Sequence, residues 1–290
     1  GFNLQEIELG VQAVIDPYMR ADIFLSFHQT GVDVEEAYAT TLDLPKGLQI
    51  RAGKYKLAFG RQNQKHAEVW PFVDNNLINN TIFGPEGFNE PGVEVSYLFP
   101  TPFFLQWQSS VTQGENTDNF NGLRKGNFAY TGRLSSSVDL SDHVTALFGT
   151  SAAFGWNNTA RGELTSIYGG DFLLKWRPAT QIGIDWQTEY IYRRRQMPTG
   201  TECDGGLSSY ILGKWSKRWG AALRGELYGI PEIGQGQRIV AISPMITFST
   251  TEFFQLRLQY EMQKTIHGGI NNEAFLQMIF SMGPHGAHQF

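Results

Sequence analysis

Hydrophobic and polar residues alternate along much of this chain, most clearly over residues 181 to 193. One side of that run carries Ile182, Ile184, Trp186, Thr188, Tyr190 and Tyr192, and the other carries Gln181, Gly183, Asp185, Gln187, Glu189 and Arg193. Successive side chains of a β-strand point to opposite faces, so this run predicts a strand with one apolar and one polar face. Residues 254 to 263 repeat the pattern.

Fifteen segments share this alternation. They are residues 4–15, 19–29, 33–44, 48–59, 92–99, 103–113, 127–140, 143–156, 164–177, 181–193, 207–216, 219–229, 238–249, 253–265 and 272–282. Most are longer than the roughly 5 to 6 residues of an average soluble strand and reach the roughly 9 to 11 that a membrane strand needs. Because single-chain bacterial barrels have even strand numbers, we predict an all-β, transmembrane, antiparallel up-and-down β-barrel of 14 or 16 strands.

The links between these segments alternate between tight and long. Tight links fall at residues 16–18, 45–47, 100–102, 141–142, 178–180, 217–218 and 250–251, and longer polar links at 60–91, 114–126, 157–163, 194–206, 230–237 and 266–271. Outer-membrane barrels have short periplasmic turns and long extracellular loops. We therefore expect residues 1–290 to form a single barrel domain, with a long extracellular or inward-folded loop at about residues 61–91.

Composition argues against several other classes of protein. The mean hydropathy is -0.28, and no stretch approaches the roughly 20 apolar residues of a membrane helix. The net charge of -5 argues against a nucleic-acid partner. The single cysteine, Cys203, excludes a disulfide framework and a Cys-based zinc or haem site, and we predict no cofactor. Gly1 leads directly into an alternating segment, so we expect a mature or trimmed chain rather than one with a signal peptide.

Two segments resemble a known family. Residues 48–60 read LQIRAGKYKLAFG and resemble a strand of porin-like outer-membrane proteins, in which Gly-Lys-aromatic-Lys precedes Phe-Gly. The ending, residues 283–290, also resembles porin-like proteins, and the terminal Phe290 resembles the assembly signal of outer-membrane barrels. The resemblance implies a bacterial outer-membrane channel for passive diffusion of small hydrophilic solutes or ions, surrounded by lipid, as a monomer, a homo-trimer or part of a larger membrane assembly.

The polar faces of the strands carry charges of both signs, which we expect to line the lumen. The candidate pore-lining residues are Arg20, Asp22, Arg51, Asp171, Lys175, Arg177, Asp185, Glu189, Arg193, Arg224, Glu226, Arg257 and Glu261. A ring of one sign selects ions electrostatically, so this mixture predicts only weak selectivity. Pairs such as Arg224 and Glu226 could equally be salt-bridge ladders without a binding role.

The loop at about residues 61–91 is too long for an ordinary connection and is rich in large apolar side chains. We predict that it folds into the barrel mouth and brings His66, Glu68, Asp74, Glu86 and Glu90 toward the solute; a packed surface lid is the alternative. His285 and His288 are candidate metal ligands if Asp16 or Asp142 supplies a third donor, although two histidines alone make a weak site.

Three other interpretations stay open at this point. A structural or sheath barrel would house or anchor a partner protein, and its sequence would look the same. An outer-membrane hydrolase would need a nucleophile oriented by a base, and no Gly-x-Ser-x-Gly elbow is present; we therefore expect no enzyme. A soluble β-sandwich would alternate as well, but with shorter strands.

Overall fold

The computed structural model describes residues 1–121, 126–158, 160–231, 237–266 and 268–283. These residues form one sheet of fifteen strands, each paired with the next in chain order. The strands are β1 Ile7–Asp16, β2 Met19–His28, β3 Gly31–Thr41, β4 Leu48–Lys56, β5 Asn89–Leu98, β6 Phe104–Thr112, β7 Ala129–Ser141, β8 Val144–Asn158, β9 Glu163–Ala179, β10 Ile182–Met197, β11 Gly200–Lys214, β12 Trp219–Tyr228, β13 Ile239–Thr251, β14 Phe254–Thr265 and β15 Ile270–Phe280. The helical segments are η1 Pro45–Gly47, η2 Ala67–Val69 and α1 Leu77–Phe83.

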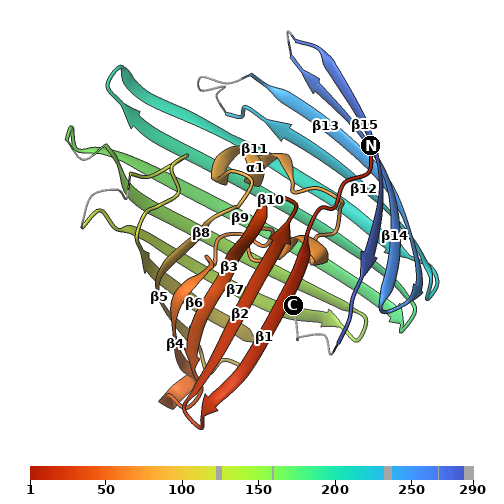
Figure 1. Cartoon of the computed structure of the whole chain (residues 1–290), viewed down its shortest axis with the longest axis horizontal. Coiled ribbons are helices and arrows are strands. Elements are labelled where there is room, and N and C mark those ends of the chain that lie inside the picture. Colours follow the sequence, from red (N-terminus) through yellow and green to blue (C-terminus); the bar gives the residue numbers. More distant parts are fainter. Residues whose placement is uncertain (122–125, 159, 232–236, 267, 284–290) are drawn as a thin grey trace.

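The predicted fold class is confirmed, because every pairing is antiparallel between sequence neighbours and the sheet curves strongly (Figure 1). Each of the fifteen alternating segments overlaps one strand, so the described sheet has fifteen strands and matches neither of the predicted totals, 14 and 16. The long link predicted at residues 194–206 is wrong. There β10 continues to Met197, β11 begins at Gly200, and a two-residue turn joins them.

The two faces of the sheet differ as the alternation predicts. In β12 the exposed Leu223 lies between the buried Ala222 and Arg224. The outer face carries many large exposed hydrophobic side chains, including Trp186 and Leu258. We call the opposite face, against which residues 57–88 pack, the inner face. In water such an apolar exterior would be costly, whereas hydrocarbon is the environment that it matches.

Residues 57–88 lie within the curve of the sheet and include α1 (Figure 1). Helix α1 contacts β10, β11 and β12, while β4 and β5 at the two ends of the loop pair with each other. The loop therefore leaves and re-enters the sheet at one place and crosses toward distant strands. No helix in the described part of the chain has the length and apolar character that a membrane crossing would need.

The two ends of the strand order approach each other at one point. The side chain of Gln277 in β15 donates a hydrogen bond of 2.7 Å to Gln5, just before β1. Fourteen antiparallel pairings separate β1 from β15, so these two strands run in the same direction.

Candidate functional site: the inner face and its loop

An aromatic cluster holds the loop of residues 57–88 inside the sheet. Phe83 stacks on Phe88 with ring centroids 5.1 Å apart and meets Phe59 edge-on at 5.1 Å. Phe120, from the next long loop, stacks on Phe88 at 5.7 Å. All four rings are buried. The apolar residues of the loop thus pack on one another and on inner-face residues such as Ile167 rather than facing solvent.

Helix α1 is fixed at its beginning by polar contacts. The side chain of Asn76 caps the helix by accepting from the backbone N–H of Asn79 at 2.8 Å. The backbone N–H of Leu77 donates to Glu226 Oε1 of β12 at 2.8 Å, which gives a buried carboxylate a charge-assisted hydrogen bond. Gly206 of β11 allows the helix to approach, because a Cβ there would lie 2.4 Å from Ile78 Cγ2. The loop is therefore docked against three strands.

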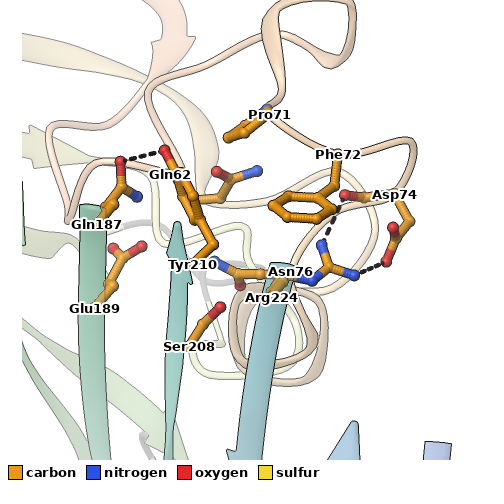
Figure 2. A pocket seen from close by; sticks show the side chains of 10 residues that line it. All are labelled: Gln62, Pro71, Phe72, Asp74, Asn76, Gln187, Glu189, Ser208, Tyr210 and Arg224. Atoms are coloured by element: carbon orange, nitrogen blue, oxygen red, sulfur yellow. Dashed lines mark hydrogen bonds and ion pairs between the residues drawn. The ribbon is translucent and has the colours of Figure 1, made fainter. Parts of the chain in front are cut away.

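A second anchor joins the loop to β12, through the contact of Asp74 with Arg224 (Figure 2), and to β14, through Gln259. Asp74 forms an ion pair of 2.6 Å with Arg224, whose guanidinium also lies over the ring of Phe72 at 4.6 Å. Gln259 donates to Asp74 and accepts from the backbone N–H of Val73. The cavity left between this part of the loop and the wall is about 10 Å³, room for about one water molecule. The loop is packed tightly against this side of the lumen.

A third anchor ties the loop to the opposite side of the sheet through His66. Its Nδ1 lies 2.9 Å from Glu8 of β1 and its Nε2 lies 2.8 Å from Glu36 of β3. Glu35 also approaches Nδ1 at 3.2 Å and pairs with Lys56 at 2.9 Å. Glu35 and Glu36 are consecutive, and both reach this cluster because a register shift in the β2–β3 ladder breaks the alternation there.

The electrostatics of this anchor favour a charged imidazole. Burial opposes the imidazolium, but hydrogen bonds to Glu35, Glu36 and Glu8 outweigh it and raise the pKa of His66 to about 12. Burial, reinforced by repulsion from Glu8, raises the pKa of Glu68 to about 7. Donor atoms of Glu8, His66 and Glu68 lie within 4.8 Å of one another, a set that could hold a metal ion. In the structure, however, carboxylates occupy both ring nitrogens of His66.

Buried ion pairs hold the wall itself together. Arg133 forms a bidentate contact with Asp171, at 2.6 and 2.9 Å. Arg193 contacts Asp204 at 2.6 Å, and Arg51 contacts Glu94 at 3.0 Å. Removing one partner of a buried ion pair leaves the other charge buried without a partner, which destabilises the protein by about 3 to 5 kcal/mol. The Arg193–Asp204 and Arg51–Glu94 pairs join neighbouring strands, and the Arg133–Asp171 pair joins β7 to β9 across β8.

The thirteen candidate pore-lining residues all lie on strands at inner-face positions, but their surroundings differ. Five contact the long loops directly: Glu189, Arg193, Arg224, Glu226 and Arg257. Asp22 and Asp171 are buried in contacts with Arg20 and Arg133. Six keep partly or largely exposed side chains: Arg20, Arg51, Lys175, Arg177, Asp185 and Glu261.

The five loop candidates are not brought to one place. His66 and Glu68 lie at the third anchor, and Asp74 belongs to the second. Glu86 is exposed. Glu90 lies in β5, where it is fully buried and accepts from the backbone N–H groups of the next loop. Sequence reasoning missed Arg61, Lys65, Glu35, Glu36, Arg133 and Asp204, of which only Arg133 continues a clear alternation.

The structure gives no support to the metal-ligand candidates or to a catalytic triad among the residues that it describes. His285 and His288 lie outside the described residues. Ser26 Oγ lies 3.0 Å from His28 Nε2, and Asp33 approaches that same nitrogen at 3.9 Å. A catalytic triad needs the acid on the other ring nitrogen, where it orients the base; in this chain Nδ1 of His28 faces the backbone oxygen of Gln5. This set therefore lacks the geometry of a triad.

Comparison with solved structures defines the class. The chain is similar to the outer membrane channel DcaP of Acinetobacter baumannii, with a TM-score of 0.62 and 11% identity over 95% of this chain and 84% of that one. It is similar to an anion-selective porin from Comamonas acidovorans, with a TM-score of 0.60 and 10% identity over 90% and 78% of the two chains. A loop-deletion variant of OmpT, an outer membrane protein of Vibrio cholerae, gives 0.62 and 8% over 94% and 89%. The chain has the porin-like β-barrel fold.

Sequence comparison supplies the family. No family model matches the chain. The chain belongs to the family of a protein of Aquifex aeolicus (strain VF5), to which it is 33% identical over 337 residues that cover 100% of this chain and 70% of the relative. That relative is described only as an uncharacterized protein, so membership of the family brings no activity with it.

Proposed function

We propose that residues 1–290 form a single outer-membrane barrel domain that acts as a channel for passive diffusion of small hydrophilic solutes or ions, without catalysis. The observation that carries this proposal is a polar, charged inner face enclosed by an apolar outer face, with a loop anchored across the interior. A lumen of this kind is suited to hold water. The fold neighbours DcaP and the Comamonas porin are channels, which supports the same function.

The loop of residues 57–88 is the proposed constriction. It contacts β1 and β3 through His66 and the opposite wall through Asp74 and α1. A segment fixed at both sides narrows the passage more reproducibly than one that hangs freely. The partly exposed charges on the inner face, such as Arg20 and Asp185, then set a mild preference among ions.

Planar-bilayer recording of the purified, detergent-extracted protein tests this proposal. We expect stable ohmic steps from the intact chain. Replacing residues 71–88 by a short Gly-Ser linker removes α1 and the Asp74 anchor, so the single-channel conductance should rise. Substitution of the exposed turn residues Pro198 and Thr199 by alanine is the matched control and should leave it unchanged.

Two results would count against the proposal. Folded protein that stays silent both with and without residues 71–88 would contradict a channel and favour a barrel that houses a partner protein. Conductance that is unchanged by the deletion would contradict the role of the loop while leaving the channel in place.

A further inference from the structure

The cations inside the barrel fall into two groups. Arg51, Arg133, Arg193 and Arg224 each have a carboxylate within 3.0 Å. Arg61 and Lys65 of the loop are different. Within the part of the chain that the structure describes, no carboxylate oxygen lies within 4.0 Å of either side-chain charge, and the Nε of Arg61 is buried without a hydrogen-bond partner. Unpaired charges in such surroundings need a counter-charge.

The backbone holds these two residues in fixed positions. They are four residues apart on one turn, where the N–H of Arg61 donates to Glu189 Oε1 at 3.1 Å and Gly60 donates to Ser151 at 3.1 Å. The backbone oxygen of Lys65 accepts from the indole of Trp70 at 3.0 Å. These contacts hold the backbone of the turn in place, and the side-chain charges of Arg61 and Lys65 are close enough to repel each other.

Sequence and strand geometry add to this arrangement. Gly60 has φ of 60°, a conformation that favours glycine, and a Cβ at this position would displace the Glu189 carboxylate from the turn. As a result, Glu189 receives a backbone hydrogen bond rather than a side-chain ion pair from Arg61. The carboxylate of Glu189 is thus engaged with the backbone of the turn.

Burial disfavours the charged forms of both side chains. Burial lowers the pKa of Lys65 to about 8, with repulsion from Arg61 and Lys175 acting in the same direction and Glu189 and Asp185 opposing it. Burial also lowers the pKa of Arg61, with repulsion from Arg133 acting in the same direction and attraction to Asp171 and Glu189 opposing it. Both side chains nevertheless remain partly exposed, so a solute in the lumen can reach them.

We infer that Arg61 and Lys65 form a binding site for a small oxyanion, such as a carboxylate or phosphate group, on the loop inside the barrel. The guanidinium offers a planar fork of N–H donors that matches two oxygens of one oxyanion, and the ammonium adds a second point charge. This inference deepens the proposed channel function and rests on it, because it names a class of solute that the constriction retains.

Two measurements with inorganic phosphate as the probe test the site. In bilayers, phosphate should reduce the current of the intact channel at lower concentration than chloride does. Arg61→Gln and Lys65→Gln remove a charge while keeping the backbone contacts, and each should raise the phosphate concentration for half-block by about tenfold or more, the effect of losing a hydrogen bond to a charged group. Lys217→Gln, which removes the same charge from an exposed turn, is the control and should behave as wild type.

Titration calorimetry on the same proteins in detergent separates failure of the site from failure of the channel. Phosphate binding to wild type and to Lys217→Gln, lost in Arg61→Gln, supports the site even if the protein never conducts, in which case only the channel function is overturned. Equal phosphate binding and equal block in wild type, Arg61→Gln and Lys65→Gln overturn the site. Absence of phosphate binding and block in a wild-type protein that conducts overturns it as well.

Discussion

At the residue scale, His66 connects the loop to the strands on one side of the barrel. One imidazole bridges Glu8 of β1 and Glu36 of β3, and such a bridge requires both ring nitrogens to carry protons. The carboxylates around it therefore act as acceptors, and the single positive charge compensates part of their mutual repulsion. This makes the anchor sensitive to the protonation of the histidine.

Substitution His66→Gln should destabilise the protein, and by more at pH 6 than at pH 9. The pKa is raised from 6.5 to about 12 by hydrogen bonds to Glu35, Glu36 and Glu8 that outweigh burial. The stabilisation is therefore complete below the unfolded value and declines as pH rises toward the folded value. We expect the apparent unfolding midpoint to fall by several degrees at pH 6.

The measurement is thermal unfolding followed by circular dichroism in detergent at one scan rate, since barrels can unfold irreversibly. Besides the three glutamates, Glu68 and Lys56 face the same cluster, and burial raises the pKa of Glu68 while the positive charge of His66 lowers it. His143→Gln, at an exposed turn, is the control and should leave the midpoint unchanged. A His66→Gln penalty that is equal at both pH values would contradict the charged state assigned to His66.

The position of a single side chain could be predicted only where the residue follows the two-residue period of a strand. Arg224 and Asp185 alternate with apolar neighbours, so sequence placed them on the polar face. Glu35 could not be placed, because the register shift between Phe24 and Leu25 puts two consecutive glutamates near His66. Arg61 and Lys65 lie on a turn without any period, and only the folded loop shows that they lack carboxylate partners among the residues that the structure describes.

At the scale of elements, the loop of residues 57–88 behaves as a small core inside the sheet. Its rings pack on one another, and α1 adds Ile78 and Ile82 to the same buried cluster. A seven-residue helix is too short to be stable by itself in water. The docking of α1 therefore depends on this cluster and on the hydrogen bond from Leu77 to Glu226.

Substitution Phe83→Ala should release part of the loop. The ring is 2% exposed and contacts both Phe59 and Phe88, so its removal leaves a cavity and costs about 3 to 5 kcal/mol. We expect faster proteolysis within residues 57–88 and noisier channel currents, with the strands intact by circular dichroism. Phe2→Ala removes a fully exposed ring and serves as the control. A Phe83→Ala protein with wild-type proteolysis would show that the ring does not hold the loop.

Most of the strands could be predicted from the sequence, because lipid on one face and water on the other favour apolar and polar residues at alternate positions. The early part of β11 is the exception, since residues 200–206 show no such alternation. There a Cβ at Gly206 would clash with Ile78 of the loop, and one at Gly205 would clash with the backbone oxygens of Ile191 and Ile230. Packing by other protein segments, rather than water, sets the residue types on the inner face of this segment.

At the scale of the whole molecule, the order of tight and long links defines two ends of the barrel. The turns at Asp142–His143 and Ser216–Lys217 lie at one end, and the loop of residues 57–88 leaves from the other. Outer-membrane barrels place tight turns in the periplasm and long loops outside the cell. The two-residue turn between β10 and β11 lies at the same end as the long loop, so it should also face outside.

The single cysteine makes this orientation measurable. Cys203→Ser keeps an acceptor for the hydroxyl of Tyr192, which lies 3.0 Å from the sulfur, and gives a cysteine-free background. In intact Gram-negative cells that export the protein, a membrane-impermeant maleimide should label Thr199→Cys rapidly and Lys217→Cys only after permeabilisation. Both positions are exposed, so intrinsic accessibility is matched and the difference reports the side of the membrane. Equal labelling of both in intact cells would mean that the outer membrane does not separate the two ends, and the barrel would then have to be placed elsewhere.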